Sequence, residues 1–167
     1  MNGQLHIRLA RESDAPLLAG LSRDTIEKNL PWRYREPEML RFMRSPRYNV
    51  IVAEIFGAQG AEVAGIEIHI AGFAVMGYGE NDAYLALLAV EPTQRRQGIA
   101  RKLLDWLLLT AETAGVESIS VELREDNSVA QHLYQSRGFT PAGTRPGGYY
   151  GVVNQNRMRL QLRAPAP

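Results

Sequence analysis

The 167-residue sequence predicts a mixed α/β fold, in which helices cover both faces of one central sheet of about seven strands. Three observations lead to this prediction. Short runs that alternate apolar and polar residues are separated by segments with apolar residues at helical spacing. These segments follow one another as strand, two helices, three strands, helix, strand, helix and two strands. Apolar residues make up 45% and charged residues 22%, which is the composition of a globular domain.

The first half of the chain supplies four strands and two helices. Ser13 or Asp14 is expected to cap the first helix, and Pro31 is expected to end it. The residues GAQG at 57–60 predict a hairpin turn between two of the strands. The predicted segments are 4–10 for the first strand, 12–30 and 36–45 for the helices, and 48–56, 61–78 and 82–91 for the next three strands.

The second half alternates helices and strands. In ESISVEL, residues 117–123, the apolar side chains point to one face of a strand and Glu122 points to the other. Asn127 is expected to cap the helix that follows, and Gly138 to close it. The predicted strands are 117–123, 138–144 and 156–163, and the last two are joined by 145–153. The predicted inner stripes are Ile99, Leu103, Trp106, Leu107 and Ala111 on helix 98–114, and Val129, Ala130, Leu133 and Tyr134 on the later helix.

Composition excludes several classes of function. The formal net charge is +1, which does not favour a surface built to bind nucleic acid or a membrane. The chain has no cysteine, so disulfides, thiolate nucleophiles and cysteine-ligated zinc are excluded. His6, His69 and His132 lie far apart, without metal-ligand spacing, so no metal is expected. The sequence shows no signal peptide and no membrane helix, and we expect a soluble, cytoplasmic protein.

Residues 95–101, RRQGIAR, lie at the start of an apolar helix. The first N–H groups of a helix have no partner inside it, and the helix dipole adds partial positive charge there. Such an end binds phosphate, and Gly98 allows a diphosphate to approach the backbone closely. Arg95, Arg96 and Arg101 add charge that pairs with phosphate oxygens. We interpret the segment as a pyrophosphate site; the alternative is an ordinary solvated loop before a core helix.

Two segments resemble one known family. Residues 89–104, AVEPTQRRQGIARKLL, resemble the acetyl-CoA-binding signature R/Q-x-x-G-x-G/A of the GNAT acetyltransferases, with Arg95, Gly98 and Ala100 at its fixed positions. Residues 121–139, VELREDNSVAQHLYQSRGF, resemble the later strand and helix of that family. Motifs for ATP and dinucleotide phosphates, G-x-x-x-x-G-K-[ST] and G-x-G-x-x-G, are absent from this position.

Within the family, the sequence is most similar to the ribosomal-protein N-terminal alanine acetyltransferases. GGYY at 147–150 resembles the aromatic loop of that group, and LPW at 30–32 resembles its Phe-Pro-Trp. The resemblance implies a mostly antiparallel sheet in one acetyltransferase domain over residues 1–163, followed by a frayed tail at 164–167. The group usually carries an acidic pair before its last strand, where this chain has NQNRM at 154–158, and segment 56–72 is longer here.

The resemblance also implies acetyl-CoA as co-substrate, an amine as acceptor, and no metal. Backbone N–H groups near Leu88, Ala89 and Val90 are expected to polarise the thioester carbonyl, with a bulge leaving them unpaired. The residues expected to bind acetyl-CoA are Leu88, Ala89, Val90, Arg95, Arg96, Gln97, Gly98, Ile99, Ala100, Arg101, Asn127 and Tyr134.

Two residues are candidates for proton transfer. Glu122 takes the position of the glutamate base of the N-terminal acetyltransferases, acting directly or through water; the alternative is a solvated or salt-bridged strand residue. Tyr134 is the candidate acid for the leaving thiolate. A phenol of pKa ~10 giving its proton to a thiolate of pKa ~8.5 faces a cost of only ~2 kcal/mol. The alternative for Tyr134 is a core residue, and the two roles are compatible.

The acceptor stays open between a protein or peptide N-terminus and a small amine, such as a polyamine, an amino acid or an antibiotic. At pH 7, freeing an α-amine of pKa ~7.7–8.0 costs ~1 kcal/mol, against ~4.6 kcal/mol for a lysine amine. A single glutamate base therefore favours the N-terminal α-amine.

Two other classes of function and the oligomeric state are also open. Residues 32–48 interleave arginines with aromatic residues, a pattern found in single-stranded RNA sites, although a solvated helix face with buried aromatics is the simpler interpretation. A non-catalytic acyl-CoA-binding module is a further alternative, against which Glu122 and Tyr134 together argue. A homodimer is compatible with the sequence.

Overall fold

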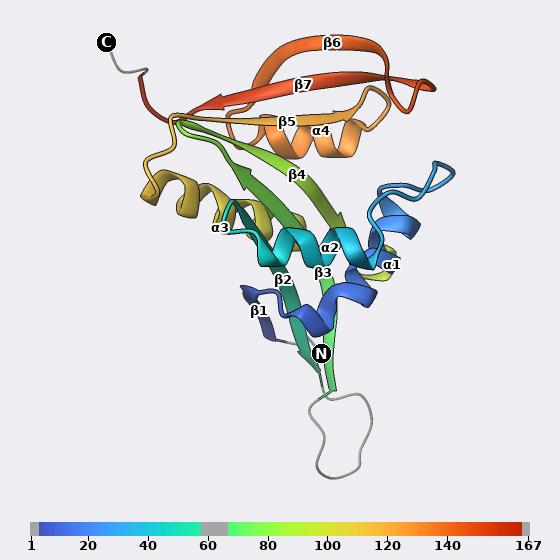
Figure 1. The fold of residues 1–167 in the computed structure, drawn as a ribbon. Coiled ribbons are helices and arrows are strands. Elements are labelled where there is room, and N and C mark those ends of the chain that lie inside the picture. Colours follow the sequence, from blue (N-terminus) through green and yellow to red (C-terminus); the bar gives the residue numbers. More distant parts are fainter. Residues whose placement is uncertain (1–3, 58–66, 165–167) are drawn as a thin grey trace. The chain divides into compact units, whose positions relative to one another are not determined.

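The computed structural model describes residues 4–57 and 67–164, which form seven strands, four α-helices and two short 3-10 turns (Figure 1). The strands are β1 (Gln4–Leu9), β2 (Tyr48–Gly57), β3 (Glu67–Tyr78), β4 (Asp82–Val90), β5 (Ser118–Arg124), β6 (Thr140–Tyr149) and β7 (Val153–Gln161). The helices are α1 (Ala15–Thr25), α2 (Glu36–Arg44), α3 (Ile99–Thr113) and α4 (Ser128–Gln135), with 3-10 turns at Glu12–Asp14 and Pro92–Gln94.

The strands form one sheet in the order β1-β2-β3-β4-β5-β7-β6. The pairs β1–β2, β5–β7 and β6–β7 are antiparallel, and β4–β5 is parallel. A parallel pair needs a crossover connection, and α3 supplies it between β4 and β5. The predicted fold class, a mixed α/β protein with a seven-stranded, mostly antiparallel sheet, is confirmed.

The chain divides into two compact units. Unit 1 consists of residues 1–75 and 87–105, and unit 2 of residues 76–86 and 106–167. In unit 1, helices α1 and α2 lie beside β2 and β3 (Figure 1). The side chains that are fully buried there include Leu18, Met39, Ile51, Phe73 and Leu103. In unit 2, β5 turns Ile119, Val121 and Leu123 inward, as its alternation predicts, and Phe139 and Met158 are buried as well.

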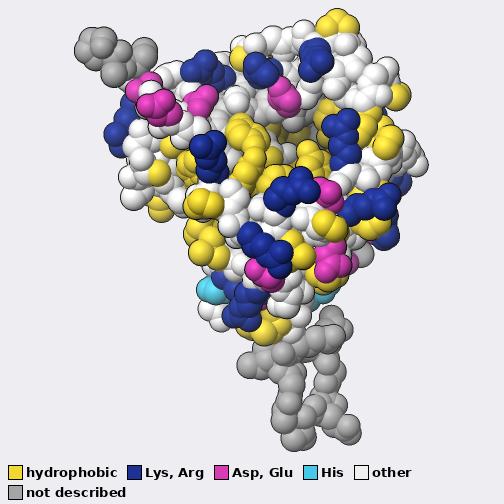
Figure 2. Space-filling model, in the orientation of Figure 1, with side chains coloured by type: hydrophobic (Ala, Val, Ile, Leu, Met, Phe, Trp, Pro, Cys, Tyr) yellow, Lys and Arg dark blue, Asp and Glu magenta, His cyan; other side chains and the backbone are white. Residues whose placement is uncertain are grey.

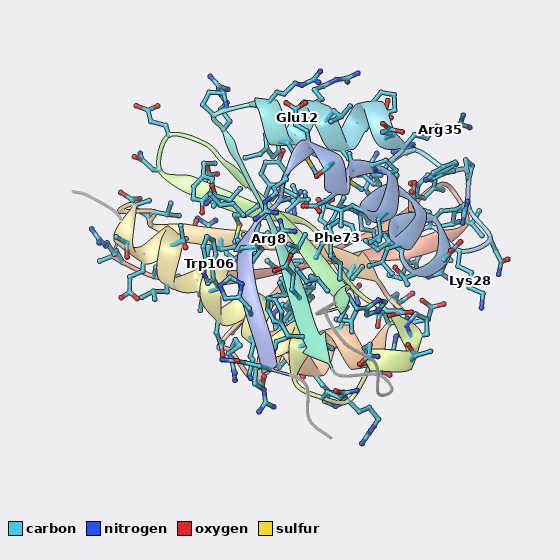
Figure 3. All side chains as sticks on the ribbon, turned by 90° about the horizontal axis from the view of Figure 1, so that it is seen from below. Arg8, Glu12, Lys28, Arg35, Phe73 and Trp106 are labelled. Carbon is cyan, nitrogen blue, oxygen red and sulfur yellow. The ribbon has the colours of Figure 1, made fainter. Side chains whose placement is uncertain are left out.

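An ion network in unit 1 joins the first strand to the turn before α1. The Arg8 guanidinium donates to Glu54 Oε1 at 2.6 Å and to Asp14 Oδ2 at 2.8 Å (Arg8 is labelled in Figure 3). Asp14 Oδ2 also accepts from Arg11 N–H at 2.7 Å. Burial by itself would raise the pKa of Asp14, but these hydrogen bonds outweigh it and hold the pKa below its usual value. Asp14 thus stabilises the 3-10 turn of which it is the last residue. The prediction that its side chain caps α1 is wrong, because that side chain makes no cap hydrogen bond.

Two further boundaries differ from the predictions. Helix α1 ends at Thr25, well before Pro31. Strand β6 extends to Tyr149, so most of the predicted connection 145–153 is strand. The predicted turn at 57–60 and the start of the predicted strand at 61–66 lie largely outside the described residues, as do the longer segment around them and the tail beyond residue 164.

The predictions of which residues form the buried stripes of α3 and α4 are partly wrong. On α3, Leu103, Leu107 and Ala111 are buried as predicted, and so is Leu104, whereas Trp106 is only half-buried. On α4, Tyr134 is buried, but the Val129 side chain is 81% exposed. Val129 stands in the first turn of an eight-residue helix, so helical spacing alone could not tell that no neighbour covers that end.

Candidate active site

The backbone between the 3-10 turn and α3 makes a sharp entry into the helix. Arg96 and Gly98 both have left-handed backbone conformations, with φ of 63° and 77°. Such residues close to a helix start direct successive N–H groups to one side, and this geometry binds anions. A Cβ atom on Gly98 would meet nothing within 4 Å, so the space over its backbone is open.

The amides of this turn, residues 96–101, find no hydrogen-bond acceptor among the described residues of unit 1. Lys102 N–H is the first to bond, to Gly98 O at 3.0 Å. The arginines Arg95, Arg96 and Arg101 are exposed, and Gln97 donates only to the neighbouring Gln94. Free amides and exposed guanidinium groups therefore gather at one helix start, as predicted for a pyrophosphate site.

The end of β4 leads into this turn. The β4–β5 ladder runs over Asp82–Leu85, so Leu88, Ala89 and Val90 lie beyond its last pair. On the side of β3, a Cβ on Gly72 would come within 2.7 Å of Ala89 O. Only glycine lets the two backbones approach so closely at that point. The bulge expected near Leu88–Val90 stays a prediction.

Beside the turn lies a pair that the sequence did not reveal. His69 on β3 and Glu91, at the end of β4, form a hydrogen bond between Nε2 and a carboxylate oxygen. Glu91 N–H also donates to Ala71 O at 2.8 Å. The residues stand 22 positions apart, and only the pairing of the strands brings them together.

Glu122 lies on the solvent-facing side of β5, in unit 2. Its carboxylate accepts from Arg157 Nη2 at 2.6 Å and from Gln155 Nε2 at 2.5 Å, both on β7. The Glu122 side chain is 45% exposed. The salt-bridged alternative therefore describes the contacts of Glu122, and its role as the base stays a prediction.

Tyr134 on α4 is buried, and its ring lies 5.5 Å from that of Phe139. Burial, and then the charge of Tyr149, raise the pKa of the Tyr134 phenol. The phenol therefore stays protonated, but giving up its proton costs more than the ~2 kcal/mol that an ordinary tyrosine would need. Its hydroxyl forms no hydrogen bond with a described residue of unit 2. The packing role is observed, and the role of Tyr134 as the acid stays a prediction.

Asn127 caps α4 as predicted, because its Oδ1 accepts from Ala130 N–H at 3.1 Å. Tyr149, at the end of β6, was not predicted as a site residue. The Arg124 guanidinium lies over its ring at 5.9 Å from the centroid, and the Tyr149 and Tyr150 rings are 5.5 Å apart. The charge of Tyr149 contributes to the raised pKa of Tyr134 and to the raised pKa of Arg124. Tyr149 and Arg124 therefore lie on the side of unit 2 where the candidate acid is found.

In unit 1, the segment between α1 and α2 is held by a carboxylate that the sequence analysis missed. Glu27 is 2% exposed and accepts from Arg33 N–H at 2.6 Å and from Tyr34 N–H at 3.2 Å. The aromatic residues of segment 32–48 pack together, with Phe42 4.8 Å from Tyr48 and 6.1 Å from Tyr34 between ring centroids. Rings packed in this way are less suited to stacking with bases than the sequence pattern suggested.

Comparison with known proteins decides the family. Residues 23–139 match the acetyltransferase (GNAT) family. The chain belongs to this family. N-acetyltransferase chemistry with acetyl-CoA as the co-substrate, predicted from the two motifs, follows from this membership.

Individual relatives agree. The ribosomal protein bS18-alanine N-acetyltransferase of Salmonella typhimurium is 35% identical over 114 residues, which cover 66% of this chain and 76% of that protein. The crystal structure of the ribosomal-protein-S18-alanine N-acetyltransferase from Escherichia coli has a TM-score of 0.78 at 25% identity, over 98% of this chain and 97% of that one. The fold also matches yncA from Salmonella typhimurium, solved with acetyl-CoA, with a TM-score of 0.76 at 19% identity over 98% and 96% of the chains.

Among the residues that the structure describes, no group of three or more histidine, cysteine, aspartate and glutamate side chains could hold a metal ion. None of the helices in residues 4–57 and 67–164 is long and apolar enough to cross a membrane.

Proposed function

We propose that this GNAT acetyltransferase transfers the acetyl group of acetyl-CoA to the α-amine of a protein or peptide N-terminus. The observation that carries the proposal is the 35% identity, over 114 residues, to an enzyme whose named acceptor is the alanine of ribosomal protein bS18. The family match over residues 23–139 contains both motifs, at 89–104 and 121–139. A cytoplasmic location, expected from the sequence, is part of the proposal.

Acetyl-CoA binding falls to the turn before α3. The diphosphate accepts hydrogen bonds from the free amides of residues 96–101, and Arg95, Arg96 and Arg101 neutralise its charge. The open space over Gly98 admits the phosphate oxygens to the backbone. The N–H groups near Leu88, Ala89 and Val90 bind the pantetheine arm and polarise the thioester carbonyl.

The transfer itself is a direct attack on the thioester. The amine nitrogen forms a bond to the carbonyl carbon while the C–S bond breaks, and the carbonyl oxygen is stabilised by backbone N–H groups. The proton lost by the amine goes to Glu122, directly or through a water molecule. The thiolate that leaves takes a proton from the Tyr134 hydroxyl.

The hydrogen bonds of Glu122 affect how it can act as the proposed base. Arg157 and Gln155 hold the carboxylate in place with two hydrogen bonds. A carboxylate is a weak base. The proposal therefore requires an acceptor amine that is easily deprotonated, which is the property of an α-amine.

A small-molecule amine is the second candidate acceptor. It is kept because this chain has NQNRM at 154–158, where the sequence comparison expects the acidic pair of the ribosomal-protein enzymes. A role in nucleic-acid binding is not part of the proposal, and a homodimer is compatible with it.

A thiol-release assay tests the proposed function. The purified chain is given acetyl-CoA with three kinds of acceptor: peptides with free N-termini, the same peptides blocked at the N-terminus but carrying a lysine, and polyamines or amino acids. The proposal predicts turnover with free N-termini and acetylation of the α-nitrogen by mass spectrometry. Turnover with small amines alone would replace it by the second candidate.

A further inference from the structure

One face of strands β5, β7 and β6 carries arginines around Glu122. Side chains alternate along a strand, so residues paired with Glu122, and residues two positions away, share its face. Glu122 is paired with Arg157 on β7, and Arg157 with Gly143 on β6. The neighbouring rows are Arg124, Gln155 and Arg145 on one side, and Ser120, Arg159 and Thr140 on the other. We call Arg124, Arg145, Arg157 and Arg159 the arginine face.

The arginine face has an excess of positive charge. Arg124 is bonded to Asp126 at 2.9 Å and Arg157 to Glu122 at 2.6 Å. Arg145 and Arg159 are exposed and form no ion pair with a described residue; Arg159 donates to the neutral Ser118 hydroxyl. Figure 2 shows Lys and Arg side chains gathered where β6 and β7 lie, with few acidic side chains among them. Two guanidinium groups therefore remain for an external anion.

The surface between these arginines is open. The residue opposite Arg157 on β6 is Gly143, which has no side chain, and a Cβ there would meet nothing within 4 Å. The Arg157 side chain is 58% exposed. A carboxylate can therefore reach the space beside Arg157 without displacing a protein side chain.

The spacing of the arginine face fits an extended peptide. Neighbouring strands lie ~4.8 Å apart and rows two residues apart are separated by ~7 Å, so Arg159 lies ~8 Å and Arg145 ~12 Å from Glu122 along the sheet. An extended chain advances ~3.3–3.6 Å per residue. A peptide with its amine at Glu122 that crosses β7 and β6 along the row of Arg157 and Gly143 therefore passes, with its second to fourth residues, between Arg159 on one side and Arg145 on the other.

We infer that the acceptor is a peptide N-terminus followed by acidic residues at positions two to four, and that Arg145 and Arg159 select it. This inference rests on the proposed function and names its substrate class.

The test compares three peptides that begin with alanine and differ only at positions two to four, which are acidic, uncharged amides or basic. For the wild-type chain, kcat/KM should be about tenfold higher for the acidic peptide than for the amide peptide, and lowest for the basic one. The preference should decline as salt rises from 0.05 to 0.5 M. The double variant Arg145→Gln/Arg159→Gln should lose the preference and keep its rate on the amide peptide. Arg145→Glu should invert the order of acidic and basic peptides.

Arg47→Gln is the matched control, because it removes one exposed arginine from the α2–β2 connection in unit 1 and should leave the preference intact. Equal rates on the three peptides overturn the inference but leave the proposed function standing. A preference for acidic peptides that survives in the double variant overturns the assignment to this face. Turnover with small amines and with none of the peptides overturns the proposed function and the inference together.

Discussion

The turn at 95–101 in unit 1 and the surface around Glu122 in unit 2 are built in different ways. The turn uses backbone amides and two left-handed residues within one short segment, 95–101, and its amides from residue 96 to 101 bond to no acceptor in the part of unit 1 that the structure describes. The Glu122 surface uses side chains from separate strands, and its central carboxylate is bonded to residues 33 and 35 positions away. The difference indicates that the turn is fixed by local conformation, whereas the chemistry around Glu122 depends on strand register.

The largest effect should come from breaking the turn. Gly98→Asp places a side chain on a residue with φ of 77° and a carboxylate where the diphosphate binds, so acetyl-CoA should no longer raise the melting temperature. ATP and NAD should not raise it in either protein. The matched control is Gly151→Asp, because Gly151 has φ of 73° and the same open space. Equal stabilisation of both folded variants by acetyl-CoA would disprove the assignment of the turn.

The next effect concerns Tyr134. Tyr134→Phe keeps the ring packed against Phe139, so the fold and the affinity for acetyl-CoA should be retained, while turnover should drop about 100-fold for want of a proton donor. Single-turnover measurements of the chemical step provide the readout. Unchanged turnover would leave Tyr134 with a packing role only.

The burial of Tyr134 also predicts how the rate of the enzyme depends on pH. Because the pKa of Tyr134 is raised, its phenol stays protonated well past the ordinary tyrosine value of ~10. The rate of the wild-type chain should therefore not decline below pH 10 through ionisation of this residue. A decline with an apparent pKa near 9 that disappears in Tyr134→Phe would contradict this.

A smaller effect is expected at Glu122. Glu122→Gln removes the proposed base but keeps the shape, and turnover should decrease about tenfold at pH 7, less than for Tyr134→Phe, because an exposed, paired carboxylate is a modest base. The defect should shrink as pH rises through the pKa of the acceptor, near pH 8 for an α-amine and well above 9 for an alkyl amine. A defect that stays constant from pH 6.5 to 10.5 would make Glu122 a positioning residue.

The smallest effect on activity should come from the Arg8 network, which belongs to neither region. Asp14→Asn breaks a buried pair, so the free energy of unfolding should drop by about 3 kcal/mol at pH 7, while acetyl-CoA still stabilises the protein. The folded-state pKa of Asp14 is depressed, so its contribution is present above the unfolded value of ~3.9 and is lost as pH falls through the folded value. Urea unfolding at pH 7 and pH 3 checks this. Asp24→Asn, at an exposed pair, should change stability little; a similar loss in both variants would contradict the prediction.

Sequence by itself determined the features that depend on neighbours within a few residues. The alternation of β5, the Asn127 cap and the turn at 95–101 all rest on backbone conformation and on contacts one helical turn away. The alternation of β5 and the Asn127 cap were predicted correctly. The motif at 95–101, with the resemblance to the GNAT family, was enough to predict acetyl-CoA as co-substrate, while its role as the pyrophosphate site stays a prediction.

Tertiary structure decided the features that depend on which distant segments meet. Glu122 is ion-paired because β7 pairs with β5 in one register, and a shift by one residue would place Arg157 on the opposite face. Asp14 bonds to Arg8 and Arg11, and so does not cap α1, because β1 runs beside its turn. Val129 is exposed because the helical period specifies a face of α4 but not the extent of the surface that covers it. Local propensity acts through a few bonds of one segment, whereas these contacts exist only once the sheet has brought its strands together.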